Sequence, residues 1–345
     1  MTSVCLYGES HGWGSFAVVG RGMQLALESA GVLAGFVSTT ELSLEDDIAP
    51  TRGLEAPVAI LTGRPDRLGD MFYAPHKKRS VLLAVNSTWI PFGIMRSICA
   101  VDEVVSPSEW GAHVIAENLA NVGAKTRVVV SKHGILPGFA PSSVEPPLNE
   151  WTLLHMASSS LSRKGTRELV EGFLSWPGVK QARLLLCLNR GELEQVRAEY
   201  RHRDNAEQIT CMPRVNGSPE SMSKLYGLAD LVVAPSRGEG FGLVPLEALA
   251  CGVPIAATVC TGHGAWFSEV PTGSKVAIQT GPMEPLEGEG PAIAPSILED
   301  GIHSFLDEAF ERRQEMKASA LAGAEQVREE WTWQRRTREW ICGLS

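Results

Sequence analysis

Residues 229–254, ADLVVAPSRGEGFGLVPLEALACGVP, predict a strand, a glycine-rich loop and a helix in close succession. The apolar run Leu231–Ala234 has the length and composition of a buried strand. The glycines within residues 235–242 allow the backbone to approach a ligand closely. A helix is expected over residues 243–250, and Gly252 follows its end. Free amides at the start of this helix and in the loop form a natural diphosphate site.

Two glutamates of this segment point to a sugar. Glu239 lies in the loop, and Glu247 lies about one turn inside the helix. A carboxylate beside a phosphate site is unfavourable unless it accepts hydrogen bonds, and sugar hydroxyl groups are obvious donors. Taken alone, the two residues could equally be a turn residue and a surface helix residue. The strand–loop–helix context favours the sugar-binding interpretation.

Outside this segment, short β-branched apolar runs alternate with longer amphipathic stretches, as is typical of parallel sheets with crossover helices. Strands are expected at about residues 3–7, 58–61, 80–85, 103–105, 127–131, 152–156, 182–188, 209–213, 253–257 and 275–278. Helices are expected at about residues 16–30, 109–119, 165–175, 193–200, 220–228, 297–326 and 331–341. Residues 136–150 contain four prolines and no periodicity, which indicates a linker, and residues 281–295 are expected to form an exposed loop.

The two alternating series predict an α/β protein with two Rossmann-like domains that face each other across a cleft. A ligand is expected at the carboxyl ends of the strands. The length of 345 residues is more than one hydrophobic core usually holds. The expected division is a first domain over residues 1–140, a linker over 141–150, a second domain over 151–328 and a final helical segment over 329–345.

Composition excludes several classes of protein. Forty acidic against 31 basic side chains give a net charge of −9, so no global positive field attracts nucleic acid or anionic lipid. The seven cysteines are odd in number and never spaced C-x-x-C, which argues against a disulfide framework or a zinc site. There is no secretory pattern in residues 1–12 and no apolar run near the ~20 residues of a membrane span. We therefore expect a cytoplasmic protein.

The sequence resembles the retaining, nucleotide-sugar-dependent glycosyltransferases of the GT-B fold, known as glycosyl transferases group 1 or family 4-like enzymes. The pair of glutamates separated by seven residues in GEGFGLVPLEALACGVP is similar to the donor-site motif of this family. Four further segments resemble family segments: SPSEW (106–110), VVVSKHGILP (128–137), LSRKG (161–165) and MSKLYGLADLVVAP (222–235). The matches are dense from about residue 100 to 260 and faint before 80.

The resemblance implies roles for the second-domain residues. Glu239 would contact the hydroxyl groups of the transferred sugar, and Glu247 would hold the nucleotide ribose. Arg163 and Lys164 would neutralise the diphosphate as the leaving group gains charge, which stabilises the transition state selectively. Many family members carry an arginine at the place of Ser159, and Arg163 is a candidate to supply that charge. The remaining donor-binding candidates of this domain are Gly240, Phe241, Gly242, Leu243, Val244 and, near the expected base-binding strand ends, Arg214.

In the first domain, the resemblance places the loop Gly12-Trp13-Gly14-Ser15 at the donor phosphates, with Gly14 and Ser15 as donor-binding residues. His11 is expected to reach the sugar or acceptor as a catalytic residue, and His133 matches a family position near the domain junction. With Ala17, this loop also satisfies the dinucleotide pattern G-x-G-x-x-A. An NAD(P)-dependent oxidoreductase or epimerase is therefore an alternative, and a catalytically idle sugar-nucleotide-binding module is a third.

The reaction implied by the family is transfer of a hexose-type sugar from a nucleoside diphosphate sugar, for which we expect UDP, to a hydroxyl acceptor with retention of configuration. No side chain stands out as a nucleophile, so attack from the face of the departing diphosphate is expected. The sequence contains no D-x-D pair, so we predict no obligatory metal and no cofactor besides the donor. The acceptor is left open among a saccharide, a lipid and a hydroxymethylated base in DNA. Two basic runs are compatible with an anionic acceptor: residues 76–79 (HKKR) and the group Arg335, Arg336 and Arg338. By the resemblance, the final helix would cross back onto the first domain.

Overall fold

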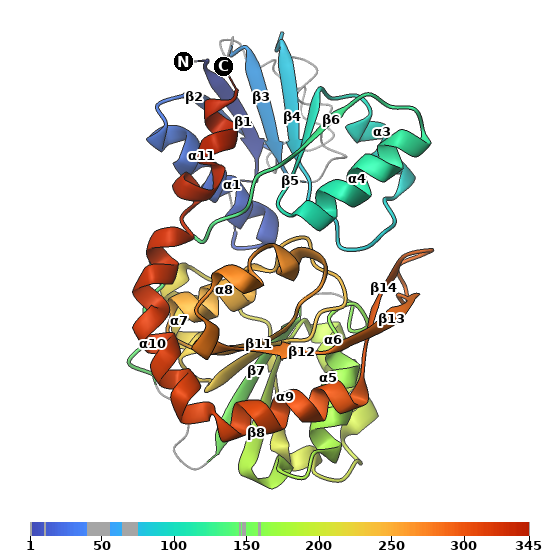
Figure 1. The fold of residues 1–345 in the computed structure, drawn as a ribbon, viewed down its shortest axis with the longest axis vertical. Helices are drawn as coiled ribbons and strands as arrows, with labels where there is room; N and C mark the ends of the chain where they lie inside the picture. Colours follow the sequence, from blue (N-terminus) through green and yellow to red (C-terminus); the bar gives the residue numbers. More distant parts are fainter. Residues whose placement is uncertain are drawn as a thin grey trace. The chain divides into compact units, whose positions relative to one another are not determined.

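The computed structural model describes residues 2–9, 12–39, 56–63, 75–144, 146, 150–157 and 160–344. Contacts divide the chain into two units. Unit 1 consists of Met1–Leu136 and Glu330–Ser345, and unit 2 consists of Pro137–Glu329. Figure 1 shows each unit as a sheet covered by helices.

Unit 1 is built on a six-stranded parallel sheet of order β2-β1-β3-β4-β5-β6. The strands are β1 (Val4–Gly8), β2 (Leu33–Ser38), β3 (Val58–Thr62), β4 (Lys78–Leu82), β5 (Glu103–Ser106) and β6 (Arg127–Val130). The helices are α1 (Ser15–Ser29), α3 (Phe92–Ile98), α4 (Glu109–Asn121) and α11 (Trp333–Cys342). The strand order reverses direction between β1 and β3, and such switch points are where doubly wound sheets bind ligands.

The final helix α11 packs on α1 within unit 1, as Figure 1 shows. Trp333 is fully buried and fills the space that Gly22 of α1 leaves, since a Cβ atom at Gly22 would lie 2.0 Å from the indole ring. At the other end of α11, Trp340 Nε1 donates to Glu103 Oε1 at 2.9 Å. The buried face of α11 is therefore fixed by side chains at both ends of the helix.

Unit 2 contains a second six-stranded parallel sheet, of order β12-β11-β10-β7-β8-β9. Its strands are β7 (Trp151–Ala157), β8 (Ala182–Leu188), β9 (Ile209–Pro213), β10 (Leu231–Ala234), β11 (Ile255–Thr258) and β12 (Lys275–Ile278). Its helices are α5 (Thr166–Ser175), α6 (Arg190–Tyr200), α7 (Pro219–Tyr226), α8 (Leu243–Ala250), α9 (Glu299–Glu311) and α10 (Arg313–Glu330). Here the switch point lies between β7 and β10.

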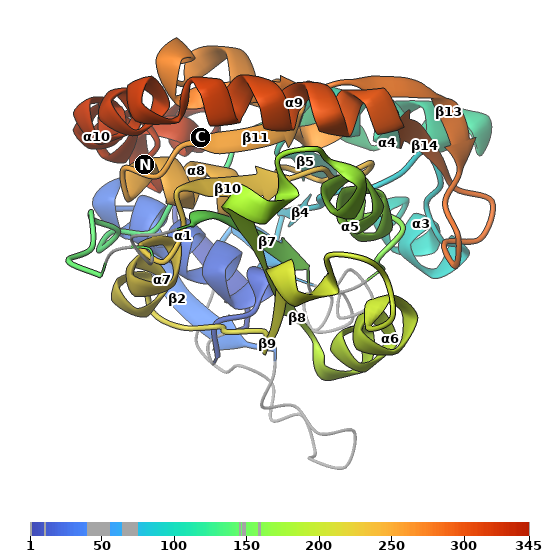
Figure 2. The same ribbon diagram turned by 90° about the horizontal axis from the view of Figure 1, so that it is seen from below.

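One face of the unit 2 sheet is covered by α5, α6 and α9, which share a single apolar core with the strands. Figure 2 shows α9 running along the sheet beside α5. The two helices approach closely because Gly172 of α5 has no side chain, and a Cβ atom there would lie 2.4 Å from Ile302 of α9. The predicted α/β class with two parallel sheets is thus confirmed.

Two predicted elements of unit 2 were wrong. Residues 281–295 are not a loop but belong to an antiparallel hairpin of β13 (Thr280–Pro285) and β14 (Ile293–Ile297). The helix predicted over residues 297–326 is interrupted at Arg312, where α9 ends and α10 begins. The hairpin escaped notice because its prolines and a register shift remove the alternation that marks a strand.

Candidate functional site

The loop between β10 and α8 adopts the predicted geometry at the switch point of unit 2. Helix α8 begins at Leu243, and Gly242 before it has a left-handed φ of +83°. A Cβ atom at Gly242 would lie 2.2 Å from Cδ2 of His263. Both the backbone conformation and the space available therefore require glycine at this position.

Glu239 lies in this loop within a cluster of basic side chains. Its Oε1 accepts hydrogen bonds from Lys164 Nζ and from Ser236 Oγ, the latter at 2.9 Å. Arg163 Nη1 lies 4.0 Å from Glu239 Oε2 and donates to the carbonyl oxygen of Gly238 at 2.8 Å. The structure thus brings together three of the predicted catalytic residues, although Lys164 and Glu239 are 75 positions apart in the sequence.

The charges of this cluster are strongly coupled. Burial raises the pKa of Glu239, but the charges of Lys164 and Arg163 outweigh burial and hold that pKa at about 2. Burial lowers the pKa of Lys164, and Arg163 and Arg214 act in the same direction, while Glu239 opposes them. The Lys164 and Glu239 side chains are only 16% and 12% exposed, so neither charge has bulk water as its main partner. The cluster suits a ligand that brings further negative charge.

Arg214 stands at the end of β9 and belongs to the same group of cations. Its backbone N–H donates to the carbonyl oxygen of Leu188 at 2.7 Å, which ties the ends of β8 and β9 together. Its guanidinium is near enough to Lys164 to affect the pKa of that lysine. A cation from the segment after β9 therefore lies near Lys164, which itself contacts the loop carboxylate of Glu239.

Glu247, in α8, is held by a tyrosine that the sequence analysis did not select. Tyr226 Oη donates to Glu247 Oε2 at 2.6 Å, and the Tyr226 side chain is completely buried at the end of α7. Burial raises the pKa of Glu247 to about 6, against the opposing effect of the tyrosine hydrogen bond. Tyr226 thus fixes one carboxylate oxygen and leaves the other available.

A short 3-10 helix, η4 (Thr261–Ala265), packs against the backbone of the glycine loop. This helix was not predicted from the sequence. The Glu239 N–H donates to Thr261 Oγ1 at 3.0 Å, and the Gly262 N–H donates to the Glu239 carbonyl oxygen at 2.8 Å. A Cβ atom at Gly262 would lie 2.4 Å from the backbone of Gly240. The signal in the sequence was the pair of glycines in TGHGA (261–265), three residues after the predicted strand 253–257.

His263 of η4 lies directly under the start of α8. Its Nδ1 donates to the Thr258 carbonyl oxygen at 3.1 Å, so the neutral ring carries its proton there. Burial lowers the pKa of His263, which keeps the ring neutral. Nearby, Trp266 Nε1 donates to the Phe241 carbonyl oxygen at 2.7 Å. Together these residues hold the loop backbone in one conformation.

The remaining donor-site candidates of unit 2 lie in or beside the loop. Gly240 and Phe241 are buried, and Gly242, Leu243 and Val244 at the helix start are half-buried. Gly14 and Ser15 are exposed at the beginning of α1 in unit 1. His11 and Ser159 lie outside the described residues.

His133 is buried in unit 1, where it packs against α11. Its side chain is 5% exposed, and its ring packs on Trp333 with centroids 4.9 Å apart. Burial lowers the pKa of His133 to about 3. A neutral histidine in this position contributes to the packing of α11.

His76 and Lys78 of the basic run at residues 76–79 have partners within unit 1. His76 is buried, with Nε2 at 2.9 Å from Tyr7 Oη and Nδ1 at 2.7 Å from the Ala56 carbonyl oxygen. Lys78 Nζ lies 3.4 Å from the buried carboxylate of Glu103. His76 and Lys78 are thus engaged within unit 1, whereas Lys77 is exposed.

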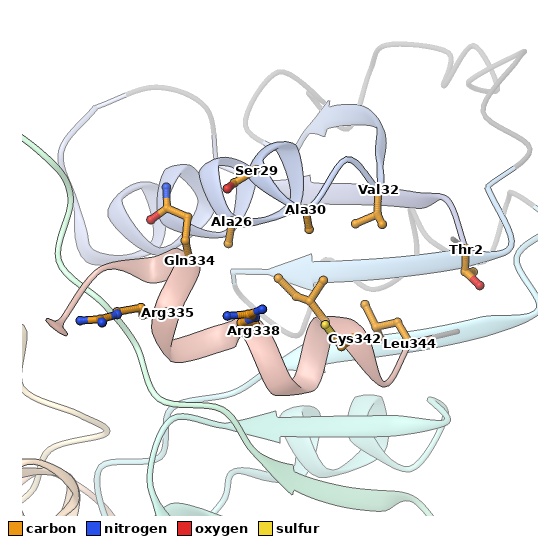
Figure 3. A pocket seen from close by; sticks show the side chains of 11 residues that line it. Thr2, Ala26, Ser29, Ala30, Val32, Gln334, Arg335, Arg338, Cys342 and Leu344 are labelled. Atoms are coloured by element: carbon orange, nitrogen blue, oxygen red, sulfur yellow. The ribbon is translucent and has the colours of Figure 1, made fainter. Parts of the chain in front are cut away.

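The second basic group, Arg335, Arg336 and Arg338, lies on α11. Arg336 stacks on the ring of Trp331 at 3.6 Å, whereas Arg335 and Arg338 line a cavity of about 500 Å³ between α1 and α11. Figure 3 shows their guanidinium groups toward one end of the cavity and apolar side chains such as Val32 toward the other.

The described residues provide neither a metal-binding cluster nor a membrane-spanning helix. Among the described residues, no group of three or more histidine, cysteine or carboxylate side chains is placed to hold a metal ion. In the same part of the chain, no helix has the length and apolar character needed to cross a membrane.

Comparison with solved structures defines the fold. A sucrose-phosphate synthase from Thermosynechococcus elongatus superposes with a TM-score of 0.68 at 14% identity, covering 99% of this chain and 98% of that chain. The Anabaena protein Alr3699/HepE, solved in complex with UDP-glucose, superposes with a TM-score of 0.66 at 13% identity over the full length of both chains. The two parallel six-stranded sheets are those of the GT-B fold.

Comparison of sequences then matches part of the chain to a known family. Residues 152–280 match the model of the family Glycosyl transferases group 1, as the resemblance indicated for this part of the chain. A D-inositol 3-phosphate glycosyltransferase of Segniliparus rotundus is 34% identical over 110 residues, which are 32% of this chain and 21% of that protein. The lipopolysaccharide core biosynthesis mannosyltransferase LpsB of Rhizobium meliloti is 53% identical over 57 residues, 16% of this chain and 15% of the relative. The chain thus matches about a fifth or less of the length of these relatives.

Proposed function

We propose that this protein is a retaining glycosyltransferase that moves a hexose-type sugar from a nucleoside diphosphate sugar to a hydroxyl group. The observation that carries the proposal is the cluster of Glu239, Lys164 and Arg163 at the loop before α8, inside the segment that matches the glycosyltransferase family. UDP is the proposed nucleotide, since the Anabaena protein of similar fold binds UDP-glucose.

In this proposal the donor lies across the loop and the start of α8. The diphosphate meets the free amides of residues 242–244 together with Lys164, Arg163 and Arg214, which supply positive charge where the leaving group becomes more negative. Glu247, oriented by Tyr226, accepts hydrogen bonds from the ribose hydroxyl groups. Glu239 accepts from hydroxyl groups of the sugar, and His11 of unit 1 is proposed to contact the sugar or acceptor.

The proposed reaction proceeds on one face of the sugar. The acceptor oxygen forms a bond to the anomeric carbon, and the bond from that carbon to the diphosphate oxygen breaks. The acceptor proton passes to the departing diphosphate. Lys164 and Arg163 stabilise the charge on that leaving group, which is their contribution to the rate.

Unit 1 is proposed to bind the acceptor and to contribute Gly14 and Ser15 to the donor phosphates. Saccharide, lipid and hydroxymethylated DNA base all present the hydroxyl group that the reaction needs. The cavity between α1 and α11, with Arg335 and Arg338 in its lining, would suit an anionic acceptor.

The test is thermal unfolding with UDP, GDP, ADP, their sugar conjugates, NAD and NADP, followed by an assay for transfer and donor hydrolysis. Binding to the folded state raises the free energy of unfolding by about 2.7 kcal/mol at a hundredfold excess over Kd. We expect one nucleoside diphosphate series to stabilise the protein and its sugar conjugate to be hydrolysed slowly. Stabilisation by NAD or NADP alone would contradict the proposal, and binding without transfer or hydrolysis would indicate an idle binding module.

A further inference from the structure

The hairpin β13–β14 is anchored to the proposed donor site through Arg237. This side chain is 6% exposed and comes two residues before Glu239 in the loop. Its Nε donates to the carbonyl oxygen of Pro295 at 2.9 Å, and its Nη2 donates to those of Glu284 and Pro285 at 3.4 and 3.3 Å. The glycine loop and both strands of the hairpin are thus connected by one buried guanidinium.

The tip of the hairpin has a defined conformation. Leu286 is buried with Ala292 and Ala294 in a small apolar cluster. The Glu289 N–H donates to the Leu286 carbonyl oxygen at 3.1 Å, and the Ala292 N–H donates to the Glu289 carbonyl oxygen at 3.3 Å. Gly288 and Gly290, on either side of Glu289, have left-handed φ angles of +78° and +63°. The backbone therefore sets where the Glu289 carboxylate can reach.

Two carboxylates of this tip pair with arginines beside the donor site. Glu289 Oε1 lies 3.7 Å from Arg163 Nε, and Glu287 Oε2 lies 2.6 Å from Arg167 Nη1. Arg163 is one of the proposed diphosphate ligands, whereas Arg167 is one turn further along, inside α5. A carboxylate from the hairpin thus lies against a cation that the proposed function assigns to phosphate.

We propose that Glu289 sets the affinity of the site for the donor diphosphate by holding Arg163 in the free protein and releasing it when the diphosphate binds. The inference rests on the proposed function. The Arg163 side chain is 8% exposed, and its Nη1 is engaged by Gly238 and Glu239, which belong to the site loop. Its Nε edge faces Glu289, whose side chain is 36% exposed and can turn toward solvent. Glu289 is therefore the partner that an incoming phosphate replaces.

The Glu289 carboxylate and the donor diphosphate are both negatively charged, and this affects the affinity for the donor. A carboxylate and a phosphate cannot share the same guanidinium edge without repulsion, so the diphosphate must displace Glu289. The Glu289 side chain is 36% exposed and its Oε1 lies 3.7 Å from Arg163 Nε, so water can solvate the carboxylate when the pair separates, and the displacement has only a modest free-energy cost. Removing the charge of Glu289 should therefore strengthen diphosphate binding, and high salt should reduce the gain.

The test compares the unaltered protein with the Glu289→Gln and Glu287→Gln variants. Glu287→Gln is the matched control, because it removes one negative charge from the same tip and breaks an ion pair at Arg167 instead of Arg163. Dissociation constants for UDP and for inorganic pyrophosphate are measured by calorimetry at low and high salt. Pyrophosphate reports on the diphosphate site independently of the nucleotide base.

We expect Glu289→Gln to lower the Kd for both probes by about three- to tenfold at low salt, with a smaller effect in about 1 M salt. Glu287→Gln should change the Kd by less than about twofold. Equal constants for Glu289→Gln and the unaltered protein would overturn the inference, and so would equal gains in both variants. If none of the three proteins binds pyrophosphate or any nucleoside diphosphate, the proposed function itself fails.

Discussion

At the scale of single residues, Glu239 and Lys164 depend on each other. With a pKa near 2 in the folded protein, below the ordinary 4.5, Glu239 stabilises the fold above pH 4.5 and loses that contribution as the pH falls toward 2. Lys164→Met removes its closest cation while Arg163 remains. We expect the free energy of unfolding to fall by about 1–3 kcal/mol at neutral pH, where the carboxylate would be left buried with too little positive charge.

Unfolding by denaturant at pH 7 and pH 3 checks this expectation, since the deficit should shrink as Glu239 takes up a proton. Donor turnover is the second measurement. Because Lys164 is proposed to act mainly on the leaving group, kcat should fall about a hundredfold while KM changes little. A deficit independent of pH would contradict the coupling of the two residues.

Glu247 and Tyr226 give a prediction about pH. Glu247 must be ionised to accept two hydrogen bonds from a ribose, and its pKa is about 6. The KM for the donor should therefore rise as the pH falls below about 6. The tyrosine hydrogen bond lowers the pKa of Glu247, so Tyr226→Phe should shift this rise to higher pH, whereas Glu247→Gln should abolish the pH dependence and raise KM throughout. Identical pH profiles for Tyr226→Phe and the unaltered protein would argue against Glu247 as the titrating group.

At the scale of elements, η4 and the start of α8 act as one unit. Gly242→Ala places a β-carbon 2.2 Å from the ring of His263 and imposes a left-handed φ on alanine. The backbone strain is about 1–2 kcal/mol, and the steric contact adds to it. We expect a lower melting temperature and loss of diphosphate binding.

A double-mutant cycle separates the two causes. In a His263→Ala background the ring is absent, so Gly242→Ala should cost only the backbone strain. The coupling energy then measures how strongly the ring restrains the loop. Additive effects of the two substitutions would show that His263 does not support the loop.

Elements with strong local patterns could be predicted from the sequence, and the others required tertiary contacts. β1 is buried at all five positions and α8 is bounded by glycines, so both matched the predicted ranges closely. β2 was missed because, at the edge of its sheet, its residues are mostly half-exposed and a glycine interrupts the apolar run. The hairpin β13–β14 depends on the side chain of Arg237, about sixty positions from Pro295, which no local pattern reports.

In the site, too, the sequence predicts local features better than contacts between distant residues. Glu239 and Glu247 could be found from their local context, because the strand, loop and helix around them are contiguous. Lys164 and Arg163 came only from the family resemblance, since their pairing with Glu239 spans 75 positions. Tyr226 and η4 were missed because their roles arise from packing beneath the loop.

At the scale of the whole molecule, the chain is acidic but concentrates cations at one point. The net charge is −9, and yet Arg163 and Lys164 lie at Glu239, and Arg214 lies near Lys164. This convergence follows from topology, since the carboxyl ends of parallel strands meet at one edge and the segments after β7 and β9 arrive there together. The fold itself therefore assembles the positive charge that a diphosphate leaving group needs.

This arrangement predicts how the reaction responds to divalent metal. The cations that would stabilise the leaving group are side chains, and the sequence has no D-x-D pair to hold a metal on the diphosphate. Transfer and donor hydrolysis should therefore be the same within about twofold in EDTA and in millimolar Mg²⁺ or Mn²⁺, whereas Lys164→Met should lose activity that neither metal restores. Assays of the unaltered protein and of Lys164→Met in EDTA, in Mg²⁺ and in Mn²⁺ check this prediction. If EDTA abolished turnover and Mg²⁺ restored it, the charge of Arg163, Lys164 and Arg214 would not suffice for the leaving group.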